Sequence, residues 1–472
     1  MQNAKKIIVL LIVLSMIVFI SCTNQNSSNS NKTFQPVELF PEPVRPAGQK
    51  DVLELRREPV DTISVGFIGL GYRGSEAIRR FTHLNGTKIS AICDITPQKL
   101  ERALKVISNA GFPKPDVYES PAGWKKLCER DDIDLIYITT NWALHTEMAV
   151  YAMEHNKDVA LAVPAAVTID ECWQLVNTSE KTQRHCLQLE NSMYDNFEMT
   201  THKMAEEGLF GEIVHAEGAY IHDLREYNFS TDILKDGFGN LWRLEQNAKR
   251  NGNLYPTHGL GPICHIMNIH RGDKLDFITS ISTNQFGITE YAKANFGEDS
   301  DFAKKDYKRG DMNTSIVRTV NGKTILIQHD VTSPRPYSRK HIISGTKGFA
   351  RKYPIKKIVL DPEYHSGHAK SIHGEELNAL LKKYEHPLVT EISEEAKAVS
   401  GGGSKSFIMD YRLIYCLHNG LPLDLDVYDA AEWSAISELS EKSVANNGMP
   451  IKVPDFTRGA WKKLDKVTYY HK

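Results

Sequence analysis

Three glycines and one acid stand at the spacing that suits the phosphates and ribose of a dinucleotide. Gly69, Gly71 and Gly74 follow an apolar run directly and precede a helical stretch. Such glycines permit a tight turn, close approach of the backbone to a pyrophosphate and close helix packing, while the helix start offers free N–H groups. Asp94 ends the next apolar run, twenty residues after Gly74. Because an acid at this place binds the ribose hydroxyls and favours NAD over NADP, the pattern predicts NAD as cofactor.

The elements that must position these residues alternate between buried strands and helices. We predict strands at 63–68, 88–93, 134–140, 158–163 and 186–192, and helices at 75–83, 146–155 and 169–184. This order predicts a doubly wound parallel sheet, a Rossmann domain over residues 61–192. Ligands bind at the carboxyl edge of such a sheet, so cofactor contacts are expected at 141–145, 162–163 and 190–191.

The pattern changes after residue 210. Residues 212–222, 277–283, 313–320 and 324–330 alternate between apolar and polar side chains, as half-buried strands do. We therefore predict an α/β protein whose second domain, residues 193–472, is α+β with an open, largely antiparallel sheet. A long amphipathic helix is expected at 427–446.

The N-terminus is typical of an exported bacterial lipoprotein. A short basic region precedes the apolar run 7–20, a Ser–Cys pair and a polar tract. The pattern predicts a signal peptide over residues 1–22, lipid on Cys22, and a flexible tether and N-terminal extension over 23–60. The lipid would anchor the protein to a membrane in the periplasm or cell envelope. A simple signal peptide or an uncleaved anchor is the alternative.

Charge and cysteine spacing argue against other classes of function. The chain has 57 basic and 59 acidic side chains, which provides no electrostatic basis for binding nucleic acid. Its cysteines are scattered without metal-type spacing. His365, His368 and His373 lie close together in sequence, and we interpret them as a polar loop. No metal is expected.

Several sequence blocks carry a resemblance to a known family. They are residues 254–262, 268–273, 332–339, 345–349, 407–412, 424–433 and 453–461. Over most of residues 60–465 the chain resembles the glucose–fructose oxidoreductase-like dehydrogenases, and within them the NAD-dependent glycoside hydrolase family 109. Members of that family resemble α-N-acetylgalactosaminidases, so the resemblance implies a small carbohydrate substrate. A homo-oligomer is one of the assemblies that the sequence allows.

The resemblance also implies a mechanism. NAD oxidises the sugar C3 hydroxyl, and the resulting ketone acidifies the C2 proton. Loss of that proton expels the C1 leaving group, water adds, and the hydride returns to C3. A side chain of ordinary basicity is then sufficient as base, and the two-carboxylate mechanism of most glycosidases is not needed.

Site residues follow from the resemblance by position. Besides the three glycines and Asp94, the cofactor is expected to contact Tyr72, Arg73, Trp142, Ala143, Leu144, His145, Ala162, Val163, Asn191 and Tyr255. The sugar is expected to contact Tyr220, Arg243, Tyr255, Pro256, Thr257, His258 and Tyr337. His258 is the expected base and Tyr337 assists proton transfer. Two alternatives stay open: His258 caps the helix that begins near Gly259, and Tyr220 simply packs within its strand.

Three places depart from the family pattern. Ala162 stands where the family has glutamate, Gly401–Ser406 stands where the family shows Gly-His-Gly-Gly-Met-Asp, and residues 235–239 resemble a local insertion. The missing loop histidine, at Gly402, is a candidate proton-transfer group for the leaving oxygen. A sugar oxidoreductase or lyase-type relative without efficient hydrolysis is therefore the alternative function, and a non-catalytic sugar-binding relative is the third.

Replacing Cys22 tests the lipoprotein prediction. Cys22→Ser removes the thiol that carries the lipid, so labelling with a radioactive fatty acid should disappear and the protein should leave the membrane fraction. Labelling that persists in Cys22→Ser would contradict the prediction.

Overall fold

The computed structural model describes residues 35–234, 239–361, 364–365, 368–399 and 404–466 of the chain. Three predictions lie outside these ranges: the signal peptide with Cys22, most of the insertion at 235–239, and the loop position Gly402. From Val37 onward the chain forms one compact unit.

A six-stranded parallel sheet occupies the first half of this unit. Its order is β3-β2-β1-β4-β5-β6, which is that of a dinucleotide-binding doubly wound sheet. The strands are β1 (Ile63–Ile68), β2 (Thr87–Cys93), β3 (Asp116–Tyr118), β4 (Leu135–Ile138), β5 (Asp158–Leu161) and β6 (Cys186–Gln188). The helices between them are α2 (Tyr72–Phe81), α3 (Pro97–Asn109), α4 (Gly123–Cys128), α5 (His145–Glu154) and α6 (Ile169–Thr182). The predicted Rossmann fold is confirmed.

Element ends differ from the prediction where they matter for the site. α2 begins at Tyr72, directly after Gly71, so Tyr72 and Arg73 belong to its first turn. β5 ends at Leu161 and β6 at Gln188, so Ala162 and Glu190 lie beyond the ends of their strands. Short 3-10 helices follow two strands, η1 (Trp142–Leu144) after β4 and η2 (Asn191–Tyr194) after β6.

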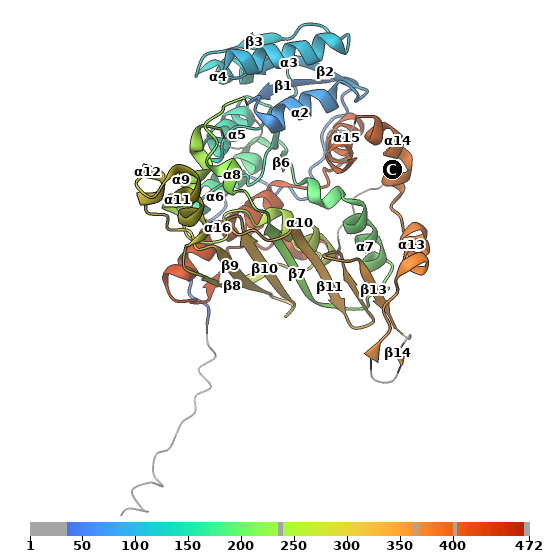
Figure 1. The fold of residues 1–472 in the computed structure, drawn as a ribbon. Coiled ribbons are helices and arrows are strands. Elements are labelled where there is room, and N and C mark those ends of the chain that lie inside the picture. Colours follow the sequence, from blue (N-terminus) through green and yellow to red (C-terminus); the bar gives the residue numbers. More distant parts are fainter. Residues whose placement is uncertain (1–34, 235–238, 362–363, 366–367, 400–403, 467–472) are drawn as a thin grey trace, which may run out of the picture. The chain divides into compact units, whose positions relative to one another are not determined.

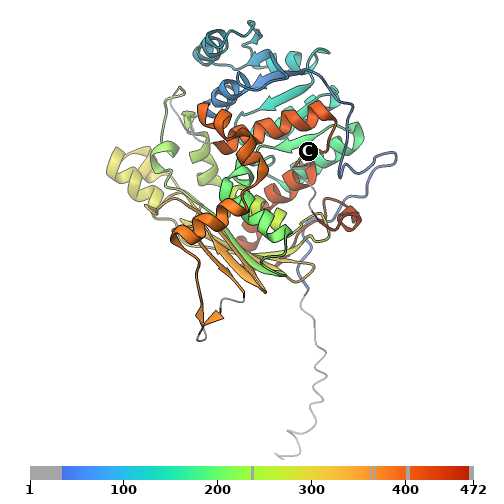
Figure 2. The ribbon, with the colours of Figure 1, turned by 90° about the vertical axis from the view of Figure 1, so that its right-hand side faces the viewer.

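The second sheet has eight strands in the order β13-β12-β11-β7-β10-β9-β8-β16. β7 and β10 run parallel and every other neighbouring pair runs antiparallel. The strands are β7 (Ile213–Ile221), β8 (Leu275–Ser282), β9 (Met312–Thr319), β10 (Thr324–Asp330), β11 (Ser338–Gly345), β12 (Gly348–Arg351), β13 (Lys357–Leu360) and β16 (Ile451–Lys452). The largely antiparallel sheet is thus confirmed, and Figure 2 shows helices on the face that points toward the parallel sheet.

Most of the remaining helices cover or flank this sheet. They are α7 (Asn196–Glu206), α8 (Arg225–Asn228), η3 (Gly239–Leu241), α9 (Trp242–Lys249), α10 (Thr257–Ile266), α11 (Gly287–Phe296), α12 (Asp301–Lys304), α13 (Gly374–Lys383), α14 (Pro387–Ala398), α15 (Ser404–Asn419), α16 (Val427–Ala445) and η4 (Ala460–Lys463). Figure 1 shows α10 and α16 between the two sheets.

The prediction that residues 427–446 form an amphipathic helix is wrong in one respect. α16 is a helix, but it is buried on nearly all sides because α6 and β6 pack against it from the parallel sheet and β8 from the other. Its serines satisfy distant backbone groups: Ser440 Oγ accepts from the N–H of Asn253 at 2.8 Å, and Ser443 Oγ from that of Ser280 at 2.8 Å. Polar residues at these positions therefore indicate no solvent-facing side.

One further expectation differs from the structure, and the predicted N-terminal extension is described in part. Its residues 35–60 pack on the rest of the chain, since Arg45 pairs with Glu180 at 2.9 Å and Arg57 with Asp158 at 3.0 Å. Of the three histidines expected in a polar loop, His365 and His368 pair across two short strands, β14 (Tyr364–His365) and β15 (His368–Ala369), while His373 is the N-cap of α13.

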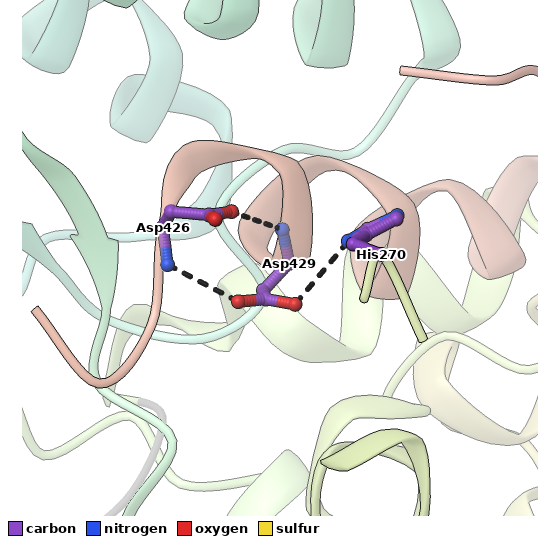
Figure 3. Close-up of side chains that lie close together, drawn as sticks. All are labelled: His270, Asp426 and Asp429. Atoms are coloured by element: carbon purple, nitrogen blue, oxygen red, sulfur yellow. Dashed lines mark hydrogen bonds and ion pairs between the residues drawn. The ribbon is translucent and has the colours of Figure 1, made fainter. Parts of the chain in front are cut away.

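A buried ion cluster fixes the start of α16 to the segment after α10 (Figure 3). Asp426 and Asp429 form a capping box there, and His270 Nδ1 lies 3.3 Å from Asp429. Side-chain atoms of these three residues lie within 4.8 Å of one another, as in a metal site. Arg271, however, reaches Asp429 at 2.8 Å and Asp426 at 3.0 Å. Burial alone would lower the pKa of His270, but Glu432 and Asp429 raise it to about 10. The guanidinium and this imidazolium together supply the positive charge that the carboxylates require.

Arg271→Met should destabilise the fold strongly. Methionine fills much of the same space but removes the guanidinium that contacts both buried carboxylates, and breaking a buried ion pair typically costs about 3–5 kcal/mol. Urea unfolding measures the loss. Arg318→Met is the matched control, because Arg318 pairs with Asp276 at 3.6 Å on the exposed surface and should lose no more than about 1 kcal/mol. Equal losses in the two variants would contradict this role of Arg271.

Candidate active site between the two sheets

The turn between β1 and α2 has the geometry of a pyrophosphate cradle. Gly69 has φ +88°, and a Cβ there would lie 2.9 Å from the backbone of Thr139. A Cβ on Gly74 would lie 2.0 Å from the carbonyl oxygen of Gly69, whereas one on Gly71 would meet nothing within 4 Å. Gly71 is also the N-cap of α2 and provides no side chain to occupy the first N–H groups. The open approach and these N–H groups fit a dinucleotide pyrophosphate.

Asp94 is held rigidly at the end of β2. Its Oδ2 accepts from the N–H of Leu70 at 2.7 Å, and its Oδ1 accepts from that of Thr96 at 2.9 Å. The carboxylate thereby connects the glycine turn to the neighbouring strand. Each oxygen retains lone-pair capacity for a further donor, as a ribose hydroxyl requires.

The predicted cofactor residues after β4 divide into two groups. Trp142 is buried in η1, while Ala143 and Leu144 are exposed. His145 is fully buried, and its Nδ1 and Nε2 lie 2.8 Å from the carbonyl oxygen of Pro164 and 3.0 Å from that of Thr140. Each ring nitrogen thus faces a backbone carbonyl oxygen, and His145 lies between the segments that follow β4 and β5. Its contact with the cofactor stays a prediction.

His258 and Glu190 form a buried pair at the junction of the sheets. His258 is the second residue of α10, and its Nδ1 lies 2.7 Å from Oε1 and 2.9 Å from Oε2 of Glu190, just after β6. The helix has Pro256 as N-cap and no side-chain cap, so the capping alternative for His258 is wrong. Among the described residues, His258 Nε2 has no hydrogen-bond partner.

Burial and charge set the protonation of this pair. Burial alone would raise the pKa of Glu190, but the charge and hydrogen bond of His258 and the N–H of Ser192 lower it to about 2. Burial lowers the pKa of His258 below its usual value, against the attraction of Glu190. At neutral pH Glu190 is therefore ionised and accepts Nδ1–H of a neutral imidazole, which leaves Nε2 as a base.

Aromatic rings and one arginine line the adjoining space. The Arg243 guanidinium lies 4.8 Å from the ring of Trp142 and 4.7 Å from that of Tyr255. The ring of Tyr220, on β7, lies 4.7 Å from Tyr255 and 5.5 Å from His258. The structure thus brings Arg243, Tyr220 and His258 together around the ring of Tyr255.

Tyr337 and the start of α10 complete the predicted set. Tyr337 is 42% exposed and precedes β11, with its ring 5.0 Å from that of His222. Pro256 and Thr257 are buried at the first turn of α10 and help to position His258. Ala162 and Val163 follow β5 directly, at the same carboxyl edge as Asn191 after β6.

Two residues of this site were not predicted. Glu190 was expected only within a cofactor-contact range, although an acid directly after a buried strand is itself a signal for the sheet's carboxyl edge. His222 Nδ1 lies 3.1 Å from the hydroxyl oxygen of Tyr220. Its spacing of two from Tyr220 is the signal, since residues i and i+2 of a strand share a face. The Tyr220 side chain therefore packs in its strand and also faces the site.

Comparisons with known proteins define the class of protein. The NAD-binding Rossmann domain of an oxidoreductase family matches residues 63–189, and the C-terminal domain of glycosyl hydrolase 109 matches residues 194–463. The fold is that of levoglucosan dehydrogenase in complex with NADH and L-sorbose: the TM-score is 0.63 at 16% identity, over 84% of this chain and all of that one. The class is therefore an NAD-binding enzyme of the oxidoreductase fold.

Sequence relatives identify the family. The chain is 52% identical to an alpha-N-acetylgalactosaminidase of Bacteroides fragilis over 415 residues, 88% of this chain and 96% of the relative. It is 48% identical to glycosyl hydrolase family 109 protein 1 of Phocaeicola vulgatus over 456 residues, 94% of each chain. The chain belongs to the glycosyl hydrolase 109 family. It is an NAD-dependent glycosidase, and the predicted cofactor is confirmed.

Asp94→Ala should weaken NAD binding. The variant removes the acceptor expected for the ribose hydroxyls, which leaves them unpaired in the complex at a cost of about 1–3 kcal/mol in binding free energy. Calorimetric titration with NAD measures it. Asp116→Ala, on the exposed edge strand β3, is the matched control and should bind NAD as the unchanged protein does. Unaltered affinity in Asp94→Ala would contradict the assignment.

Proposed function

We propose that this enzyme releases terminal α-linked N-acetylgalactosamine, or a closely related sugar, by the redox-assisted route of its family. The identity of 52% to an alpha-N-acetylgalactosaminidase supports the substrate class. The observation that carries the chemistry is the His258–Glu190 pair, 2.7 Å apart and buried beside the carboxyl edge of the parallel sheet.

His258 is the proposed base for the C2 proton. When bound, NAD supplies reversible oxidation at C3 of the sugar, which makes that proton acidic. Because Glu190 holds the Nδ1 side of the ring, the ring presents Nε2 to the sugar in a fixed orientation and tautomer. The ionised carboxylate also stabilises the imidazolium that forms when the proton is taken.

The aromatic and cationic side chains are proposed to bind the sugar. Tyr220 and Tyr255 provide flat apolar surface against a ring, and Arg243 can donate to a hydroxyl or to the acetamido carbonyl. Its guanidinium packs against the rings of both Trp142 and Tyr255, so little side-chain freedom remains to be lost on binding. Tyr337, at the exposed edge, is proposed to assist proton transfer.

One observation favours a second candidate. Ala162, after β5, carries no carboxyl group where the family pattern has glutamate. An enzyme that oxidises and eliminates without efficient hydrolysis would tolerate this loss, so a sugar oxidoreductase or lyase is the alternative.

We further propose that the protein is a lipoprotein of the cell envelope. The basic, apolar and Ser–Cys pattern at residues 1–22 supports this location. In the part of the chain that the structure describes, no helix has the length and apolar character to cross a bilayer.

Turnover in heavy water tests the mechanism. If the C2–H bond breaks, N-acetylgalactosamine released from its 4-nitrophenyl α-glycoside should carry deuterium at C2, as mass spectrometry detects. His258→Ala should retain NAD but lose this exchange together with activity, by about 10²–10⁴-fold. His215→Ala, half-buried near the other end of β7, is the control and should behave as the unchanged enzyme. Cleavage without deuterium at C2 would exclude the proposed route.

A further inference from the structure

A half-buried lysine, Lys405, lies near enough to the His258–Glu190 pair for its charge to act on both residues. Lys405 is the second residue of α15, and the next side chain, Ser406, accepts a hydrogen bond from Nδ2 of Asn191 at 2.8 Å. Because Asn191 directly follows Glu190, this bond fixes the start of α15 against the end of β6. The ammonium is close enough for its charge to lower the pKa of His258.

The Lys405 ammonium lacks an ion-pair partner of its own among the described residues. Lys405 forms no ion pair with any acidic side chain that the structure describes, although three acids lie near enough to attract its charge. Each of them is paired elsewhere: Glu190 with His258, Asp195 and Glu198 with Arg339 and Lys352. A partly buried charge that lacks its own counter-ion is unusual in a structural role and suits a group that acts on a ligand.

The surroundings also lower the pKa of Lys405. Burial, and then the charge of Arg339 on β11, lower the pKa of Lys405 to about 8, against the attraction of the three acids. A proton donor works best when its pKa lies near the working pH. The ammonium is therefore populated near neutrality and still gives up its proton readily.

The proposed glycoside cleavage needs such a donor, because an alkoxide is a poor leaving group. We propose that Lys405 is a catalytic acid that protonates the departing glycosidic oxygen and later takes a proton from the attacking water. The proposal rests on the proposed function.

The proton balance closes over one turnover. The C2–H electron pair forms a C1=C2 double bond while the proton passes to Nε2 of His258. The C1–O bond breaks, its electron pair stays on oxygen, and the Lys405 ammonium protonates it. The resulting amine takes a proton from water as the water oxygen bonds to C1, and His258 returns its proton to C2. Glycoside and water become alcohol and free sugar, with both side chains restored.

The test compares leaving groups. Methyl and 4-nitrophenyl N-acetyl-α-galactosaminide differ in their need for a proton, because nitrophenolate leaves without one. Lys405→Met should lose about 10²–10⁴-fold in kcat/KM on the methyl glycoside and less than about 10-fold on the nitrophenyl one. Lys405→Arg should behave like Lys405→Met, since a guanidinium keeps its proton. Lys203→Met, half-buried on α7, should change neither rate.

The pH profile provides a second measurement. Because an acid must be protonated to act, kcat/KM for the methyl glycoside should fall as pH rises through about 8. That decline should be absent in Lys405→Met, with NAD retained and the unfolding temperature unchanged.

Three outcomes separate the hypotheses. Equal losses on both substrates, or activity preserved in Lys405→Arg, would show that Lys405 acts as a fixed charge and would overturn the proposal alone. If the unchanged enzyme shows neither deuterium exchange at C2 nor cleavage, the proposed function fails and the Lys405 proposal falls with it. Exchange in Lys405→Met with slow methyl-glycoside cleavage supports both.

Discussion

The fully buried carboxylate of Glu190 stays charged because His258 contacts it at 2.7 Å. His258 lies on α10, which packs against the second sheet. An ionised acid in such a place is costly unless it is paired and hydrogen-bonded. The contact therefore does two things at once. It fixes the start of α10 to the end of β6, and it orients the imidazole toward the edge where a cofactor and sugar must meet. Any shift between the two sheets would break the pair, so catalytic geometry and domain packing depend on the same interaction.

That contact is possible only because α10 approaches its neighbours unusually closely. A Cβ on Gly259 would lie 2.4 Å from the backbone nitrogen of Ala219 on β7, and one on Gly261 would lie 3.0 Å from Cγ of Glu190. Side chains at either position would push the helix away from the strand or from the carboxylate. The two glycines therefore allow α10 to lie close enough for the ring of His258 to reach Glu190. They affect the chemistry only through this distance.

Short-range sequence patterns predicted the features of the fold that depend on residues close together in the chain. Buried apolar runs placed β1 and β10 at their observed bounds, and the glycine spacing predicted the turn before α2. Interactions between distant residues were not accessible in this way. Glu190 and His258 are 68 residues apart, and the backbone carbonyls that engage His145 belong to two different strand ends. The start of α15 follows a run of glycines, a pattern that favours a loop. Only the fold, which places Asn191 against Ser406, connects Lys405 with the site.

Burial explains how a lysine can take the place of an acidic residue near a leaving group. Removal from water disfavours the charged form of any group, which raises the pKa of a carboxyl and lowers that of an ammonium. The two pKa values therefore approach neutral pH from opposite sides. A chain that lacks the family's loop histidine at Gly402 can recover a proton donor by burying an ammonium, provided that nearby carboxylates do not pair with it and raise its pKa again. Arg339 and Lys352 meet that condition here, because they engage Asp195 and Glu198 and so withhold both acids from Lys405.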